Sequence, residues 1–172
     1  MKAKLIEAVA TGIEAADTNK DGKLDLPEFI AFTSTFSETI TKEFAQYWFR
    51  GLDIDITGRL TFDVVRSHFQ MMIDHWDEIE NNKPPVELLK VYYRGMDRDR
   101  NAQVNLEEMR NFLQSNDEKM NTHMAAVKLR KMDKDNSGTI SFYEYCISFG
   151  HEVPKSIDPY DGKGPSQCCL IL

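Results

Sequence analysis

One twelve-residue pattern occurs four times along this chain, and its repetition limits the possible fold more than any other feature. The copies begin at Asp17, Asp53, Asp97 and Asp133, so their starts are 36, 44 and 36 residues apart. The first copy, residues 17–28, has oxygen-bearing side chains at alternate positions, a glycine at position 6 and a glutamate at position 12. The spacing predicts two pairs of repeated units with a longer connection between the pairs.

Oxygen-bearing side chains at alternate positions of a short loop suit a hard divalent cation. Ca²⁺ takes roughly six to eight oxygen ligands at about 2.3–2.6 Å in a flexible geometry. Gly22 stands at the sharp turn, where a positive φ costs little because glycine has no Cβ. The first copy therefore predicts a calcium site. Its expected ligands, the Lys23 carbonyl among them, are Asp17, Asn19, Asp21, Lys23, Asp25 and Glu28.

The third and fourth copies keep the ligand positions with small departures. Their expected ligands are Asp97, Asp99, Asn101, Gln103, Asn105 and Glu108 in the third copy, and Asp133, Asp135, Ser137, Thr139, Ser141 and Glu144 in the fourth. The fourth copy has a serine at position 5, and its hydroxyl is a usable neutral ligand. Ala102 replaces the glycine of the third copy, and an alanine held at positive φ costs about 1 kcal/mol. We expect both copies to bind calcium.

The second copy lacks the residue that would close the coordination shell. Val64 stands at position 12, and position 9 is only Thr61. Losing the bidentate carboxylate removes two ligands and one negative charge. We therefore expect no calcium in the second copy, and three calcium sites in the chain, with Mg²⁺ as a competing ion.

On these residues the chain is identified as a member of the EF-hand superfamily, since the first copy satisfies D-x-[DN]-x-[DN]-G-x₅-E at every specified position. The resemblance covers residues 1 to about 150. It implies an all-α fold of helix–loop–helix units in two pairs, in which position 8 of each loop adds a short strand that pairs with its neighbour's. Position 8 is Leu24, Leu60, Val104 and Ile140. The use of loops 1, 3 and 4, with loop 2 degenerate, resembles the sarcoplasmic calcium-binding proteins.

The chain divides at its helix-breaking residues. We expect an N-terminal pair over residues 1–80, a linker over 81–85, a C-terminal pair over 86–149 and a flexible tail over 150–172. Apolar residues in steps of three and four predict one continuous amphipathic helix over residues 62–79, and Pro84 with Pro85 ends it. The next helix is expected over 86–96. Ser115 and Glu118 predict a capping box for the helix that enters loop 4.

The C-terminal residues carry a separate signal. Cys169 and the three residues after it fit C-a-a-X with leucine last, the form that usually directs geranylgeranylation. One lipid gives reversible membrane binding and stable anchoring needs a second, which Cys168 could carry. We predict attachment to the cytosolic face of a membrane through Cys169 and Cys168. The alternative is an unmodified end that folds back into a groove of one lobe.

Composition excludes several other classes of protein. The net charge is −7, and 14 of the 28 acidic residues lie in the four loops, so the acidity is accounted for by ion binding. A nucleic-acid partner would call for a basic surface instead. The start of the chain shows no signal peptide, and three cysteines make no disulfide framework, so a cytoplasmic protein is expected. We find no pairing of nucleophile and base, and we expect neither enzymatic activity nor a small-molecule substrate.

Three functional interpretations remain. The first is a calcium sensor or buffer held at a membrane. The second is a soluble calmodulin-like regulator that grips an amphipathic helix of a target protein, for which seven of the eight methionines offer adaptable surface. The third is a coelenterazine photoprotein or luciferin-binding protein. We disfavour it, because those photoproteins are richer in tryptophan and histidine and end in a functional proline, whereas this chain ends in Leu172.

Overall fold

The computed structural model describes residues 2–36 and 39–162. Within them the helices are α1 (Lys2–Ala16), α2 (Leu26–Ser34), α3 (Lys42–Leu52), α4 (Phe62–Asp74), α5 (Trp76–Glu80), α6 (Val86–Met96), α7 (Leu106–Asn116), α8 (Thr122–Met132) and α9 (Phe142–Ser148). The strands are β1 (Lys23–Asp25), β2 (Arg59–Thr61), β3 (Gln103–Val104) and β4 (Ile140–Ser141). No helix in the described part of the chain is long and apolar enough to cross a membrane.

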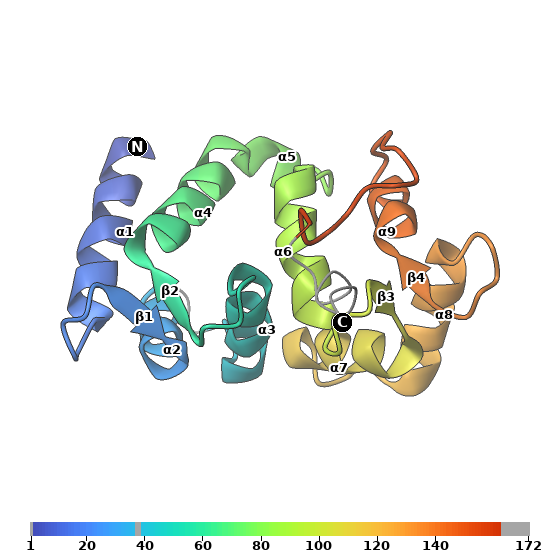
Figure 1. Cartoon of the computed structure of the whole chain (residues 1–172), viewed down its shortest axis with the longest axis horizontal. Helices are drawn as coiled ribbons and strands as arrows, with labels where there is room; N and C mark the ends of the chain where they lie inside the picture. Colours follow the sequence, from blue (N-terminus) through green and yellow to red (C-terminus); the bar gives the residue numbers. More distant parts are fainter. Residues whose placement is uncertain (1, 37–38, 163–172) are drawn as a thin grey trace, which may run out of the picture.

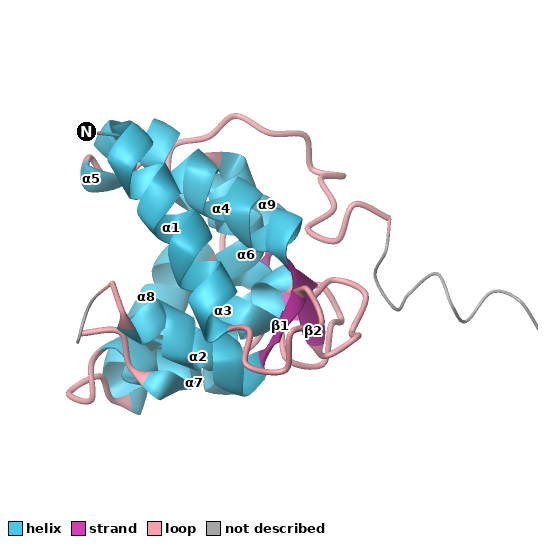
Figure 2. Cartoon of the chain, turned by 90° about the vertical axis from the view of Figure 1, so that its left-hand side faces the viewer, coloured by secondary structure: helices cyan, strands magenta, loops and turns pink. Residues whose placement is uncertain are grey.

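The four strands join the loops in pairs, which confirms the predicted fold class. Strands β1 and β2 pair antiparallel with Leu24 opposite Leu60, and β3 pairs with β4 with Val104 opposite Ile140. All four of these side chains are buried, at 2 % exposure or less. Figure 2 shows β1 and β2 beside the loops at one end of the helices. Loop 2 therefore supports loop 1, as the residues at position 8 predicted.

Each pair of units has its own hydrophobic core, and the two cores meet through α3 and α6. The N-terminal cluster is built around Ile13, Phe29 and Trp48, and it also takes in Val91 from α6. The C-terminal cluster is built around Tyr93 and other residues of α6 to α9. Helices α3 and α6 lie side by side in the middle of the molecule (Figure 1). Helix α6 thus contributes to both cores.

Glycine makes the contact between α3 and α6 possible. A Cβ added at Gly51 of α3 would overlap the carbonyl oxygen of Val91, and a Cβ at Gly95 of α6 would overlap the carbonyl oxygen of Tyr47. Only residues without a side chain let two helix backbones approach this closely. Arg50 adds a hydrogen bond across the contact, from NH1 to the Gly95 carbonyl at 2.9 Å.

Two sequence predictions about helices are wrong. The expected continuous helix over 62–79 is broken at His75, whose φ of −105° and ψ of 24° are not helical. Helix α5 has no buried residue, so core packing does not hold it in line with α4. Ser115 does not cap the helix entering loop 4, because α7 continues past it and its hydroxyl donates to Phe112 O at 2.7 Å. Asn121 is the cap, and its side chain accepts from Met124 N at 3.0 Å.

The prediction of a flexible tail is also wrong for its first part. Residues 151–162, here called the C-terminal strap, run back from α9 along α6 (Figure 1). Val153 and Ile157 pack against the C-terminal core, and Tyr160 is 2 % exposed. These apolar side chains fill a surface that the core already provides, so the segment need not form a core of its own. Cys168 and Cys169 lie outside the described residues.

Candidate metal centre

The ends of the helices place the ligands of loop 3. Asp97 follows the last residue of α6, and Glu108 is the third residue of α7. A capping box fixes the start of α7: Asn105 Oδ1 accepts from Glu108 N at 3.0 Å, and Glu108 Oε2 accepts from Asn105 N at 3.1 Å. The other carboxylate oxygen of Glu108 accepts from Arg98 N at 2.7 Å. The glutamate at position 12 is therefore held across the loop by backbone amides.

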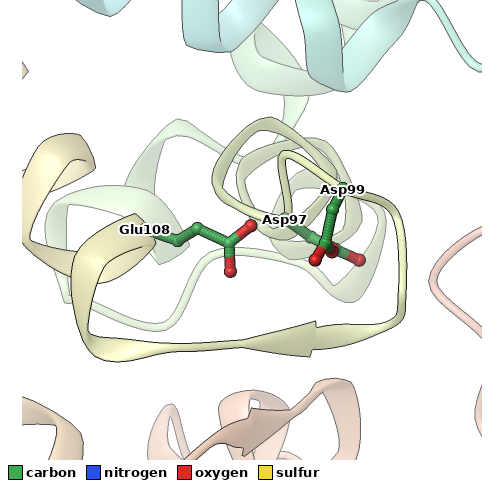
Figure 3. A group of neighbouring side chains, drawn as sticks. All are labelled: Asp97, Asp99 and Glu108. Carbon is green, nitrogen blue, oxygen red and sulfur yellow. The ribbon is translucent and has the colours of Figure 1, made fainter.

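Three carboxylates of loop 3 converge. Asp97, Asp99 and Glu108 each offer an oxygen within 4.8 Å of the others, and Figure 3 shows Glu108 reaching from its helix towards the two aspartates. Asp97 and Glu108 are buried. Burial raises the pKa of Asp97 to about 6, although hydrogen bonds from Tyr160 and Ala102 N act in the opposite direction. Buried carboxylates held this close lack a compensating charge, which a divalent cation would supply.

Loop 4 repeats this arrangement. Asp133, Asp135 and Glu144 also offer oxygens within 4.8 Å of one another. Ser141 and Glu144 form the capping box at the start of α9. Burial acts to raise the pKa of Glu144, but hydrogen bonds from the backbone and side chain of Ser141 and from the amides of Lys134 and Asp135 together outweigh it, so the pKa is lowered and the carboxylate stays charged. Ser137 Oγ lies 3.3 Å from Thr139 Oγ1, on the rim of the loop.

Loop 1 has the same backbone frame with a different charge arrangement. Glu28 accepts from Thr18 N at 2.9 Å and from Asp25 N at 3.0 Å, and the Asp25 amide is the main cause of its lowered pKa. Asp21 forms an ion pair with Arg59 of β2, the residue at position 7 of loop 2. Among the described residues, the groups of three convergent carboxylates lie in loops 3 and 4 and not in loop 1. Position 3 of loop 1 is an amide, Asn19, which offers no charge.

Loop 2 keeps the shape of a binding loop without its closing ligand. Asp53 accepts from Thr57 N and Gly58 N at 3.0 Å each, as the first aspartate does in the other loops. Val64, at position 12, is 40 % exposed and has no oxygen to offer. Ile56 stands at position 4 with φ of 56°, a conformation that β-branched residues rarely adopt.

The remaining predicted ligands lie in their loops as the spacing required. The side chains of Asn19, Asn101 and Asp135 each accept an amide two residues further along the loop, at 2.7–3.0 Å. Lys23 and Gln103 begin strands β1 and β3. Ala102 has φ of 62°, so the positive φ expected at position 6 is present despite the alanine.

Sequence reasoning missed three residues that contact the loops from elsewhere in the chain. Arg59 meets loop 1 from loop 2. Arg100 of loop 3 donates to the carbonyl oxygens of Asp53 and Ile54 in loop 2, at 2.7 Å each. Tyr160 of the C-terminal strap donates to Asp97 Oδ2 at 2.8 Å. The ligand pattern uses none of these three side chains, so no local signal could have identified them.

The donor set fits Ca²⁺ chemically. Loops 1, 3 and 4 offer carboxylate, amide, hydroxyl and carbonyl oxygens, the hard ligands that calcium takes, and no thiolate or imidazole belongs to the set. The glutamate of each of these loops is already directed inward by hydrogen bonds from the loop's own amides. A bidentate ligand that is oriented before binding loses less freedom when the ion arrives.

Comparisons with known proteins agree with this chemistry. Residues 87–149 match the family model of the EF-hand domain pair, and residues 10–33 match that of the EF hand. The chain is 30 % identical over 139 residues to the probable calcium-binding protein CML32 of Arabidopsis thaliana. This match covers 80 % of this chain and 91 % of that protein. It is 29 % identical over 134 residues to the probable calcium-binding protein CML31 of the same plant, covering 78 % and 90 %.

A kinase is also among the relatives. The chain is 24 % identical over 140 residues to calcium-dependent protein kinase 10 of Arabidopsis thaliana, a match that covers 81 % of this chain but only 24 % of the kinase. Three quarters of the kinase therefore has no counterpart in this alignment, and its activity gives no reason to assign catalysis here.

Proposed function

Because this chain belongs to the EF-hand superfamily of calcium-binding proteins, we propose that it is a calcium sensor that binds three Ca²⁺ ions, at loops 1, 3 and 4, and performs no catalysis. The observation that carries the proposal is the convergence of three carboxylates in loop 3 and again in loop 4, with ligand oxygens within 4.8 Å of one another. Loop 1 offers the same kinds of ligand on the same backbone frame.

Electrostatic repulsion within loop 3 favours the ion. Two unit charges 4.8 Å apart, the largest separation between the Asp97 and Glu108 ligand oxygens, repel by roughly 3 kcal/mol at an effective dielectric constant of about 20. Both side chains are buried, so water relieves little of this repulsion. A bound divalent cation replaces the repulsion with attraction to each carboxylate, which makes calcium binding favourable at this loop.

Isothermal titration calorimetry on the full chain tests the number of sites. The parent protein should bind three calcium ions, and Glu28→Gln, Glu108→Gln and Glu144→Gln should each remove one. Glu107→Gln is a matched control, since it also removes a loop-3 carboxylate, but one whose side chain is 77 % exposed and lies 4.0 Å from Arg110. Val64→Glu should restore a fourth site. A parent protein that binds four ions, or none at loops 3 and 4, would overturn the proposal.

Exposed apolar surface on the N-terminal pair favours a sensor over a closed buffer. A groove between α1 and the junction of α4 with α5 is lined by Leu5, Ile73 and Trp76, with Lys2 and Asp77. Leu5 and Trp76 are 44 % and 50 % exposed. If calcium binding exposes more of this apolar surface, an amphipathic helix of a target protein could bind there. A hydrophobic dye titrated with calcium measures the change: constant fluorescence up to saturation would exclude the sensor and favour the buffer.

Attachment to a membrane stays a prediction, since Cys168 and Cys169 lie outside the described residues. The sequence around Cys169 supports it through its match to the C-a-a-X pattern. The intact mass of the protein purified from its native cell is the test. A geranylgeranyl adduct on Cys169 is expected, and an unmodified chain would contradict the prediction.

A further inference from the structure

The C-terminal strap reaches the first ligand of loop 3. Tyr160 Oη donates a hydrogen bond of 2.8 Å to Asp97 Oδ2, and the two residues are 2 % and 0 % exposed. The equivalent Oδ2 atoms of Asp17, Asp53 and Asp133 accept the amide of position 6, with no second donor among the described residues. The first ligand of loop 3 is thus distinguished from the first aspartates of the other loops by a hydrogen bond from a side chain of the strap.

This second donor determines which oxygen of Asp97 is free for an ion. A carboxylate oxygen has two lone pairs available for hydrogen bonding. Both lone pairs of Oδ2 are used, by Ala102 N at 2.8 Å and by Tyr160 Oη. Oδ1 accepts only Asn101 N among the described residues, at 3.1 Å, and so keeps one lone pair. The tyrosine therefore fixes the carboxylate in the orientation that presents Oδ1 to calcium.

Several contacts hold the strap in place around Tyr160. Asp161 forms ion pairs with Lys90 Nζ at 2.6 Å and with Arg94 NH1 at 3.9 Å, both from α6. Arg94 NH1 also donates to the carbonyl of Pro159 at 3.3 Å. The side chains of Lys90 and Arg94 are 12 % and 7 % exposed and that of Asp161 is 48 % exposed, so these pairs are partly shielded from solvent. Docking of the strap thus delivers the tyrosine hydroxyl to loop 3.

The same tyrosine lies beside the connection between loops 2 and 3. The guanidinium of Arg100 lies 5.8 Å from the centre of the Tyr160 ring, within the range of a cation–π contact. Arg100 stands at position 4 of loop 3, and its donors reach the carbonyls of Asp53 and Ile54 in loop 2. Strap, loop 3 and loop 2 therefore form one contiguous set of contacts.

We propose that Tyr160 is a positioning residue for the calcium site of loop 3, so that docking of the strap and binding of calcium at this loop strengthen each other. The proposal rests on the calcium site proposed above for loop 3. Its physical basis is that the hydrogen bond orders the Asp97 carboxylate before the ion arrives, which lowers the cost of binding. Reciprocity then requires that bound calcium stabilise the docked strap by the same factor.

The geometry favours cooperation between the Tyr160 hydroxyl and calcium at loop 3 over competition between them. Competition would require the tyrosine to occupy the lone pair that calcium needs. The lone pair left on Oδ1 is not in contact with the hydroxyl, which bonds to the other oxygen. Groups that orient a metal ligand without touching the metal typically change metal affinity by about 10- to 100-fold when removed. We expect an effect at the lower end of this range.

The direct test is Tyr160→Phe, which removes the hydroxyl and keeps the ring. It is made in the full chain with Glu28→Gln and Glu144→Gln, so that loop 3 is the intact site, and calcium affinity is measured by calorimetry. We expect binding at loop 3 to weaken about tenfold. The matched control is Tyr92→Phe, since the Tyr92 hydroxyl makes no hydrogen bond to the described residues; loop-3 affinity should not change. If the Tyr160 ring served only for packing, Tyr160→Phe and Tyr92→Phe would both leave the calcium affinity of loop 3 unchanged.

The reciprocal effect gives a readout that needs no change at Tyr160. Hydrogen exchange of the amides in residues 151–162 should slow about tenfold when the parent protein is saturated with calcium. Glu108→Gln should abolish this slowing, and Glu144→Gln should not. Exchange in the strap that is indifferent to calcium would overturn the proposal even if Tyr160→Phe failed to fold.

The outcomes separate this proposal from the proposed function. If loop 3 binds calcium and Tyr160→Phe leaves its affinity unchanged, the positioning role is wrong while the site stands. Tighter binding in the variant would show that the hydroxyl competes with the ion, and would also overturn the proposal. If the parent loop 3 binds no calcium in the Glu28→Gln, Glu144→Gln background, the proposed site and the role of Tyr160 fail together.

Discussion

Replacing Gly51 with alanine should destabilise the contact between α3 and α6. The new Cβ would overlap the carbonyl oxygen of Val91 and lie 2.8 Å from its carbonyl carbon. These are backbone atoms, so no rotamer change can relieve the overlap. The two helices would have to separate by about 1 Å, a gap that forfeits a quarter to a half of the dispersion attraction of the atoms that face it.

The net cost follows from two opposing effects. Overpacking a well-packed interface costs about 1–3 kcal/mol, and a rigid backbone places this site at or above the upper end. Alanine raises the free energy of unfolding by about 1 kcal/mol through its higher helix propensity than glycine's. We therefore expect the free energy of unfolding to fall by about 2 kcal/mol, which for a chain of this length lowers the Tm by about 4–8 °C.

Thermal unfolding followed by circular dichroism, with calcium chelated, measures this change. Gly12→Ala is the matched control, because the added Cβ would lie 3.2 Å from the ring of Phe32, a side-chain contact that a shift of a few tenths of an ångström relieves. Its Tm should stay the same or rise, since α1 gains helix propensity. A Gly51→Ala protein as stable as the parent would refute the view that the two cores depend on this close contact.

Three further predictions concern other described residues. Ile56→Asn should raise the free energy of unfolding by about 1 kcal/mol in a denaturant titration, because asparagine tolerates the positive φ that isoleucine does not; no gain would show that the loop relaxes around isoleucine. Arg59→Ala should tighten calcium binding at loop 1 by up to about fivefold in calorimetry, since an ion pair on the surface is worth at most about 1 kcal/mol; weaker binding would contradict this. Burial lowers the pKa of His68 to about 3, and Trp48 Nε1 donates to its Nε2 at 2.6 Å. The unfolded state takes up a proton on this imidazole below pH 6.5, whereas the folded state disfavours that proton. The stability that neutral His68 contributes is therefore complete above pH 6.5 and is lost as the pH falls towards 3. In His68→Gln the free energy of unfolding should therefore fall less steeply as the pH drops between these limits, by up to about 1.4 kcal/mol per pH unit. An unchanged slope of this free energy against pH in an acid titration would show that His68 is not responsible.

The sequence by itself determined the positions of the four loops and their turns. The ligands of a loop lie within twelve residues, so their spacing alone predicts where the chain must turn and which oxygens point inward. The same is true of the valine that leaves loop 2 without its closing ligand, and of the alanine that takes a positive φ in loop 3. Position 8 identified the residues that pair the loops, because one buried strand position recurs in every copy.

Only the tertiary structure decided how the loops are linked to the rest of the molecule. The contacts of Arg59 with loop 1, Arg100 with loop 2 and Tyr160 with loop 3 join residues that are 38 to 63 positions apart in the chain. Contacts over such separations leave no periodic pattern, since either partner could be replaced without disturbing local spacing. The break at His75 and the docked strap were missed for the same reason: the presence or absence of a packing surface elsewhere in the chain decides both.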